Sequence, residues 1–169
     1  QMIFPNAPFP HPQVPGGRMW YNFPADFRFQ TTAAFRDRPD LSASRQALLS
    51  FLTTLPAETG VPLERTILGG FSQGGAMTLD VGLDLPLAGL MVLSGYLHAP
   101  PQPQTERFPP VLMVHGRQDM VVPLESAQEA RDSLRQLQVN LDYQEFDMGH
   151  EIQPIVLTQL QSFAKTILK

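Results

Sequence analysis

Apolar runs and amphipathic segments alternate along most of the chain, and this alternation predicts an α/β fold. Strands are expected at residues 65–71, 87–95, 109–116 and 141–149, with a further short strand at residues 2–5. Most of these runs are continuously apolar, which is typical of strands buried on both faces. Helices are expected at residues 41–60, 73–83, 123–139 and 152–169. Strands and helices in this order favour a mostly parallel sheet with helices on both faces.

The segment at residues 41–60 has a clear helical pattern. Its apolar residues recur at helical spacing and would form one buried face: Leu48, Phe51, Leu52 and Leu55. Ser42 or Ser44 is expected at the N-cap, because a serine hydroxyl can accept a hydrogen bond from the free N–H groups of a first turn.

The N-terminal segment has a different character. From Pro5 to Pro24, proline and glycine recur too often for a helix or a central strand. Aromatic residues are frequent in this region: Phe4, Phe9, Trp20, Tyr21, Phe23, Phe27 and Phe29. Disordered segments are poor in aromatics, so we expect residues 5–29 to form an ordered loop over the functional site rather than a disordered tail.

The composition of the chain indicates which classes of protein it can belong to. The chain has 169 residues, 43% of them hydrophobic, which suits a single domain spanning residues 1–169. No apolar run is long enough for a membrane span. The net charge is −4 and the basic residues are scattered, which argues against nucleic acid as a partner. Because the chain contains no cysteine, any nucleophile must be another residue type.

The stretch "GGFSQGG" at residues 69–75 places one serine between a predicted strand and a predicted helix. In the frame Gly70-x-Ser72-x-Gly74, small flanking residues let the chain turn sharply and hold the serine hydroxyl exposed. The helix behind Ser72 would offer free N–H groups to an oxyanion. The alternative reading is an ordinary glycine-rich start of a helix.

Two more strand ends carry reactive side chains. Asp119 follows the strand at residues 109–116, and His150 follows the strand at residues 141–149. The carboxyl ends of parallel strands share one edge of a sheet, where catalytic groups collect. The order serine, aspartate, histidine is that of a triad in which histidine takes the serine proton and the carboxylate orients the imidazole. Asp142 and Asp147 compete as the acid, and Asp119 could instead be a turn residue.

The other histidines give weaker signals. His115 ends a strand but precedes Asp119, which is the wrong order for the base. His98 and His11 lie in proline-rich loops without a neighbouring cluster of ligands. No spacing of His, Asp and Glu suggests a zinc site, so we expect no metal and no other cofactor.

Several separated motifs in this chain resemble one known family. They read "FPNAP", "WYNF", "RTILGGFSQGGAMTL", "LAGLMVLSGYL", "PPVLMVHGRQDMVVPL" and "MGHEI". In this order they are similar to the phospholipase/carboxylesterase family of small α/β-hydrolases, which includes the acyl-protein thioesterases. The similarity runs over essentially the whole chain and is far more specific than the serine motif alone.

The resemblance implies roles for particular residues. It implies Ser72 as nucleophile, Asp119 as acid and His150 as base, with the backbone N–H of Gln73 in the oxyanion hole. The segment Trp20-Tyr21-Asn22 matches the family's W-[YF]-D segment near the acyl site, so Trp20 is expected to contact substrate, and Asn stands where Asp is usual.

The chain also departs from the family pattern. Family members carry an LHG-x-G segment before the PNAP motif, which ends a central strand and supplies a second oxyanion-hole donor. That segment is absent here, and the chain starts at Gln1 without a leader sequence. We therefore expect a fragment or processed product that lacks N-terminal strands of the α/β-hydrolase fold, unless another chain supplies that segment or the sheet closes differently. Taken alone, it would be poorly soluble or nearly inactive, because it lacks both a central strand and the second oxyanion donor.

The leading hypothesis is a serine hydrolase that cleaves carboxylic esters or thioesters through an acyl-enzyme, as in carboxylesterases, lysophospholipases and acyl-thioesterases. The aromatic segment from Phe4 to Phe29 would wall an apolar acyl pocket. The alternatives are a non-catalytic binding module and a peptidase of the same fold. The expected partner is a small ester or acylated substrate. A homodimer stays open, and the sequence does not determine the localisation, for which the cytoplasm is our expectation.

Overall fold

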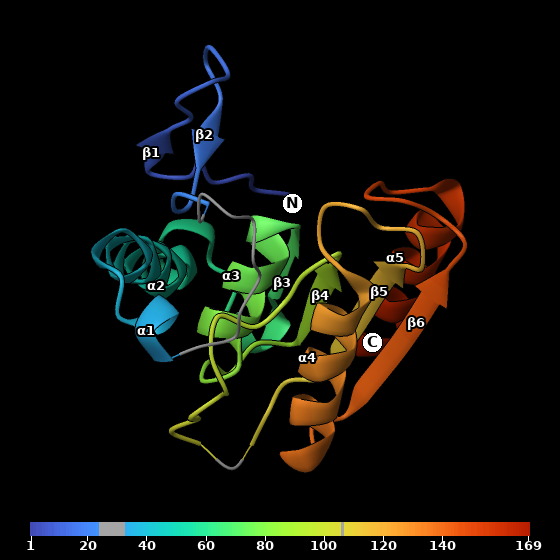
Figure 1. Cartoon of the computed structure of the whole chain (residues 1–169). Coiled ribbons are helices and arrows are strands. Elements are labelled where there is room, and N and C mark those ends of the chain that lie inside the picture. Colours follow the sequence, from blue (N-terminus) through green and yellow to red (C-terminus); the bar gives the residue numbers. More distant parts are fainter. Residues whose placement is uncertain (24–32, 106) are drawn as a thin grey trace.

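The computed structural model describes residues 1–23, 33–105 and 107–169 and contains a four-stranded parallel sheet (Figure 1). The strands lie in the order β3-β4-β5-β6. Their bounds are β3 Ile67–Phe71, β4 Gly89–Leu93, β5 Val111–Gly116 and β6 Leu141–Phe146. All three pairings are parallel, with Leu68 opposite Leu90, Leu90 opposite Val111 and Val111 opposite Leu141. The predicted parallel α/β arrangement is confirmed.

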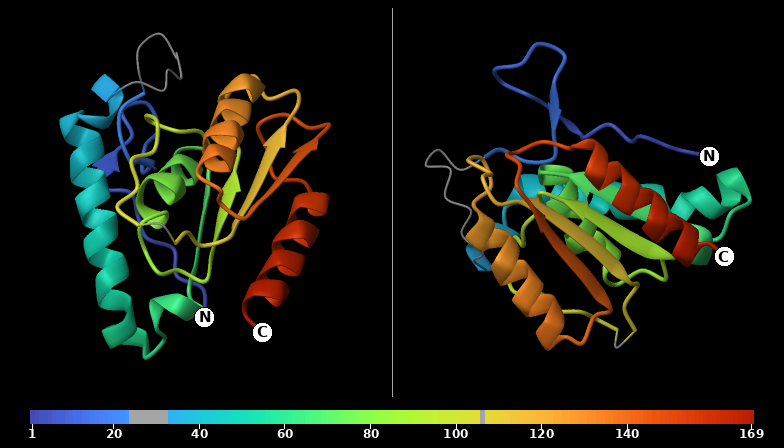
Figure 2. Two further views of the ribbon diagram at one scale, coloured as in Figure 1. Left: turned by 90° about the horizontal axis from the view of Figure 1, so that it is seen from below. Right: turned by 90° about the vertical axis from the view of Figure 1, so that its right-hand side faces the viewer.

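Helices cover both faces of this sheet (Figure 2). Their bounds are α1 Ala33–Arg36, α2 Pro39–Thr59, α3 Gln73–Gly82, α4 Leu124–Gln136 and α5 Pro154–Ile167, with a 3-10 turn at Leu63–Arg65. The helices α3 and α4 lie on one face and α5 on the other, while α2 packs against the outer side of α3. In the described part of the chain, no helix has the length and apolar character that a bilayer crossing requires.

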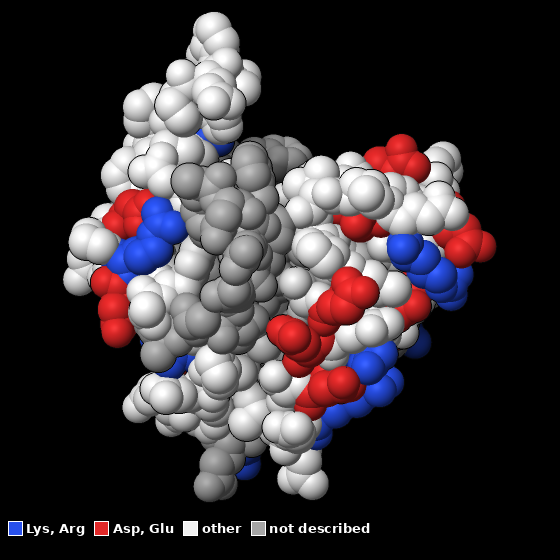
Figure 3. Space-filling view, viewed as in Figure 1, with Lys and Arg blue, Asp and Glu red and all other residues white. Residues whose placement is uncertain are grey.

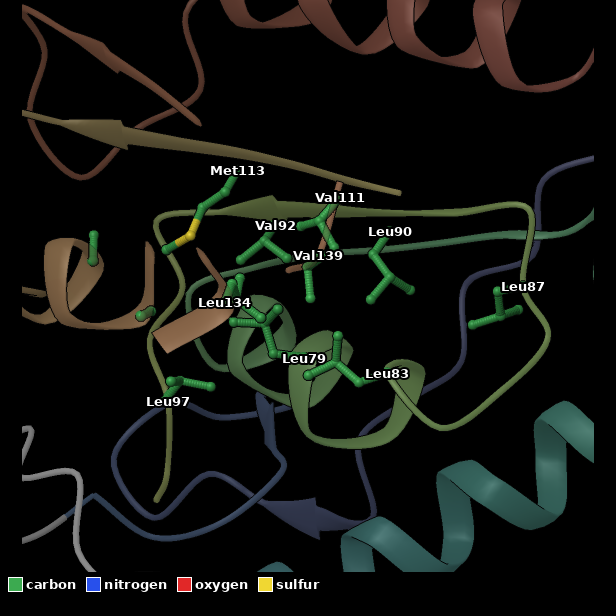
Figure 4. Close-up of a cluster of buried hydrophobic side chains, with 12 residues drawn as sticks. Leu79, Leu83, Leu87, Leu90, Val92, Leu97, Val111, Met113, Leu134 and Val139 are labelled. Atoms are coloured by element: carbon green, nitrogen blue, oxygen red, sulfur yellow. The ribbon is translucent and has the colours of Figure 1, made fainter. Parts of the chain in front are cut away.

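The buried strand β5 explains why its sequence is continuously apolar. Val111 and Met113 point into a cluster with Leu79 of α3 and Leu134 of α4 (Figure 4). The intervening Leu112 and Val114 belong to a second cluster, on the side of α5. Because successive strand residues face opposite sides of a sheet, a strand covered by helices on both faces needs apolar residues at every position.

The long helix α2 confirms the predicted apolar face but not the predicted cap. Leu48, Leu52 and Leu55 are buried, as the spacing indicates. The serine N-cap prediction is wrong: the helix begins at Pro39, and Arg38 stands at the N-cap. Proline fits the first helical position because its missing N–H has no helical acceptor to lose. Ser42 and Ser44 therefore lie inside the helix.

The N-terminal segment differs from the prediction in one respect. Residues 2–5 form no strand, and Met2 and Phe4 are 84% and 83% exposed. These residues form no ladder with β3, whose described partner is β4, and a run without a paired edge does not form a strand. Two short antiparallel strands follow, β1 Phe9–Pro10 and β2 Arg18–Met19, in a ribbon that projects from the body (Figure 1).

The structure therefore supports only part of the predicted aromatic wall of the acyl pocket. Phe4 is too exposed to line a pocket, whereas Tyr21 is fully buried. Phe27 and Phe29, which were expected in the same wall, lie outside the described residues.

The charged residues lie mainly on the outside. Figure 3 shows acidic and basic side chains mixed over the region of α4, where Glu125, Glu129, Asp132 and Arg135 are exposed. Its opposite side buries Ala127, Ala130 and Leu134. This face of the molecule therefore carries charges of both signs.

Candidate active site

Ser72 occupies the sharp turn between β3 and α3. Its backbone has φ 56° and ψ −119°, a conformation that non-glycine residues rarely adopt. Its N–H donates to the carbonyl of Leu93 at 2.8 Å, and its own carbonyl accepts from the N–H of Ala76 at 3.0 Å. The neighbouring strand and the helix thus hold the serine in a strained position, which is frequent at functional sites.

Gly70 makes this turn sterically possible. A Cβ at Gly70 would lie 2.1 Å from the carbonyl oxygen of Gly74, closer than real side chains approach a backbone. By contrast, a Cβ at Gly74 would meet nothing within 4 Å. The close approach of the strand to the first turn of α3 therefore requires glycine at position 70 but not at position 74.

Asp119 and His150 are joined by a short hydrogen bond at the neighbouring strand ends. The distance from Nδ1 of His150 to Oδ2 of Asp119 is 2.7 Å. Asp119 follows β5 and His150 follows β6, which pair in register as far as Gly116 and Phe146. Because an ionised carboxylate only accepts, Nδ1 carries the hydrogen and Nε2 keeps its lone pair. A histidine in this state can take a proton at Nε2.

The carboxylate of Asp119 is fixed by the loop that follows it. Its Oδ1 accepts the N–H groups of Val121 and Val122 at 2.9 and 2.8 Å, leaving Oδ2 for His150. The side chain is fully buried. Two backbone donors on one oxygen orient the other toward the imidazole and stabilise the negative charge of the buried group.

His115 contacts the loop that begins at Asp119. Its Nε2 lies 3.0 Å from the carbonyl of Val122 and 3.5 Å from Oδ2 of Asp119. A carbonyl only accepts, so Nε2 carries the hydrogen. Burial lowers the pKa of His115, which keeps the ring neutral. Sequence reasoning set this residue aside as a base and missed its contact with the loop of the acid.

The loop of His150 packs tightly on the end of β5. The N–H of Gln118 donates to the carbonyl of Met148 at 3.1 Å, and a Cβ at Gly116 would lie 2.3 Å from that same oxygen. The ring of His150 contacts Phe71, the residue before Ser72, with ring centroids 4.7 Å apart. His150 therefore lies at the same edge of the sheet as the serine.

No hydrogen bond joins the hydroxyl of Ser72 to His150 in the part of the chain that the structure describes. Catalytic hydrogen bonds are often long in structures without substrate and tighten when substrate binds. The geometry thus joins two of the three predicted residues directly and brings the third into their neighbourhood.

Gln73 connects this turn to the N-terminal segment. Its Oε1 accepts the N–H of Trp20 at 3.0 Å, and its Nε2 donates to the carbonyl of Tyr21 at 2.8 Å. The hydroxyl of Ser44 also bonds the carbonyl of Trp20. Trp20 is consequently held beside the residue that follows Ser72. At the start of α3, the backbone N–H of Gln73 is among those without a helical acceptor.

The competing acids lie elsewhere. Asp147 has a side chain 76% exposed and pairs with Arg117 at 2.7 Å. Asp142 is exposed near the start of β6, and its carboxylate accepts from Gln144. Among the residues that the structure describes, no three His, Asp and Glu side chains converge as metal ligands would.

Comparison with known proteins places the chain in a family. Residues 1–168 match the Phospholipase/Carboxylesterase family. The chain belongs to this family. Acyl-protein thioesterase 1 of Neurospora crassa is 33% identical over 164 residues, which cover 89% of this chain and 66% of that protein. The chain therefore spans just under two thirds of the length of this relative.

Two solved structures resemble the fold of this chain closely. The crystal structure of esterase PE8 has a TM-score of 0.84 and 33% identity, covering 97% of this chain and 77% of its own. The crystal structure of Arabidopsis thaliana SOBER1 has a TM-score of 0.77 and 29% identity, covering 99% and 83%. The α/β-hydrolase class predicted from the sequence is thereby confirmed.

Proposed function

We propose that this member of the Phospholipase/Carboxylesterase family is a serine hydrolase that cleaves carboxylic esters or thioesters through an acyl-enzyme. The observation that carries the proposal is the 2.7 Å bond between Asp119 and His150, at the sheet edge where Ser72 sits in its strained turn. The relatives named as an acyl-protein thioesterase and an esterase support the same reaction class.

The reaction begins with attack by Ser72. Its Oγ adds to the carbonyl carbon of the substrate while Nε2 of His150 takes the hydroxyl proton. The imidazolium that forms is stabilised by Asp119, whose carboxylate remains ionised. The negative charge moves to the former carbonyl oxygen, and the N–H of Gln73 at the positive end of α3 donates to it.

Collapse of the tetrahedral intermediate breaks the bond to the leaving group. His150 returns its proton to the departing alcohol or thiol, and the acyl group stays on Oγ of Ser72. Water then attacks the acyl-enzyme with His150 again as base, releasing the carboxylic acid and restoring the serine. No cofactor enters any of these steps.

The acyl group would lie against the segment that Gln73 holds. Trp20 is partly exposed and Tyr21 is buried behind it, so an apolar chain could pack on the indole. An ester and a thioester present the same acyl carbon to Ser72, and the substrate class proposed here covers both.

Hydrolysis of p-nitrophenyl butyrate tests this proposal. Because the N–H of Gln73 is the one oxyanion donor identified among the described residues, we expect weak but measurable turnover in the purified protein, and its loss in Ser72→Ala. The control is Ser50→Ala, an exposed serine of α2, which should leave turnover unchanged. Equal turnover in the protein and in Ser72→Ala would contradict a serine mechanism, and a folded protein without activity on any ester would favour a binding module.

A further inference from the structure

A cavity lies beside the C-terminal half of α3, away from Ser72. Its volume is about 290 Å³, and its walls come from α3, from Arg36 and Arg45 of the first two helices, and from the loop at residues 97–104. Pockets for drug-sized ligands begin at about 300 Å³, so a cavity of this size suits a small molecule. The reaction proposed above uses none of these residues.

His98 is the most unusual residue in this cavity. It is only 3% exposed, and neither ring nitrogen has a hydrogen-bond partner within the described ranges. Nδ1 lies 3.6 Å from Oδ1 of Asp80, beyond normal hydrogen-bond length. The ring is held in place by stacking on Phe35 at 5.3 Å and by the edge of Tyr21 at 4.9 Å. A buried polar group without a partner in a cavity indicates a site where a ligand or water completes its hydrogen bonds.

The cavity wall carries two arginines and two aspartates, and Arg36 is the residue among them that can bind an anion. Asp80 is already matched by Arg45, whose Nε and Nη2 donate to its two oxygens at 2.8 and 3.1 Å. Arg36 donates to the carbonyl of Pro100 at 2.5 Å and has no carboxylate within ion-pair distance in the described part of the chain. The remaining acid, Asp84, is exposed and accepts from the N–H of Gln104 at 2.7 Å. Arg36 is therefore a partly buried guanidinium with no carboxylate at ion-pair distance among the described residues.

The opposite wall is apolar. Leu79 and Leu83 project from α3, and Leu97 approaches them from the following loop (Figure 4). Ala76 and Ala99 add small side chains to this wall. A ligand that satisfies both walls needs an anionic head for Arg36 and His98, and a short hydrocarbon body for the leucines.

We propose that this cavity binds a short-chain carboxylate, with its head group at Arg36 and His98. The site does not depend on the catalytic role of Ser72. The ligand class includes the acids that an esterase would release from short esters. The binding test is therefore made in the Ser72→Ala variant, which cannot hydrolyse ester by the proposed mechanism.

Titration with sodium hexanoate, followed by calorimetry and by NMR of the histidine rings, tests the proposal. We expect saturable binding that shifts the resonances of His98, identified by their absence in His98→Phe. Arg36→Gln should weaken binding at least tenfold, whereas Arg65→Gln, which removes an exposed arginine outside the cavity, should not. Hexanol and hexylamine should bind at least tenfold more weakly than hexanoate.

Three outcomes would overturn the site. A hexanoate titration that does not saturate would mean that only water completes the hydrogen bonds of His98. If Arg36→Gln binds hexanoate as tightly as the unsubstituted site does, or if hexanol binds as tightly as hexanoate, the site does not recognise a carboxylate head group. Shifts confined to His150 would place the acid in the catalytic site instead.

Discussion

Asp119 accepts a 2.7 Å hydrogen bond from His150 on one carboxylate oxygen while two backbone N–H groups hold the other. Because the backbone N–H groups fix one oxygen, the other oxygen orients the imidazole more firmly than a carboxylate with a single contact would. It also separates Asp119 from the other acids near the histidine, because Asp147 is exposed and turned toward Arg117.

Replacing the acid should therefore impair catalysis without unfolding the protein. Asp119→Asn puts an amide where the imidazole donates, which favours the wrong tautomer, and we expect kcat to fall by about 10⁴-fold. Asp147→Asn is the matched control and should change kcat by less than about threefold. Ester hydrolysis with circular dichroism of both variants makes the comparison, and the reverse ranking would move the acid to Asp147.

The turn at Ser72 offers a second matched pair of variants, Gly70→Ala and Gly74→Ala. Gly70→Ala forces a Cβ to within 2.1 Å of the carbonyl of Gly74, so the strand and helix must separate. We expect loss of soluble protein or a fall of roughly 3 kcal/mol or more in the free energy of unfolding. Gly74→Ala meets no atom within 4 Å and should be tolerated in thermal melts. Similar melting temperatures for the two variants would show that the turn is not as tight as described.

Gln73 should matter through its side chain as well as its backbone. Gln73→Met keeps the length but leaves the N–H of Trp20 and the carbonyl of Tyr21 unpaired, at about 1–3 kcal/mol for each buried group. We expect lower stability in urea and a rise in KM for esters with apolar acyl groups. Gln46→Met, at an exposed position of α2, is the control. An unchanged KM would show that holding Trp20 does not serve substrate binding.

Asp80 predicts how stability depends on acid pH. Burial alone would raise the pKa of this carboxyl, but the two hydrogen bonds from Arg45 and the nearby ring of His98 hold the pKa below its ordinary value. A carboxyl with a depressed folded pKa stabilises the native state above its unfolded pKa, near 3.9, and loses this contribution as pH falls further.

Asp80→Asn should accordingly lower the free energy of unfolding by about 2 kcal/mol at pH 7, since hydrogen bonds to a charged group are lost. The difference from the unmodified protein should shrink as pH falls below about 4. Urea unfolding across this range, with Asp142→Asn as an exposed control, measures both effects. A difference that stays constant with pH would rule out ionisation of Asp80 as the cause.

Much of the fold was predictable because its signals are local. Continuous apolar runs such as Val111 to Val114 are typical of strands covered on both faces, and the leucines of α2 mark its buried side at helical spacing. The strand ends then place Ser72, Asp119 and His150 on one edge of a parallel sheet, so the catalytic candidates followed from topology.

Other features depend on distant contacts and could not be predicted. The start of α2 at Pro39 was missed because serine propensity competes with proline there, and Ser44 is engaged by Trp20, 24 residues away in sequence. The residues at 2–5 read as a strand, but a strand needs a pairing edge that sequence pattern alone does not reveal. His115 was set aside on chain order, although its position two residues before a tight loop hinted at support for Asp119.

The most direct test of Ser72 as nucleophile is mass spectrometry of the intact protein after treatment with a fluorophosphonate. We predict a single adduct on the peptide that carries Ser72, much slower labelling in His150→Ala, and no adduct in Ser72→Ala. A folded protein that stays unlabelled, or an adduct that persists in Ser72→Ala, would contradict the proposed mechanism.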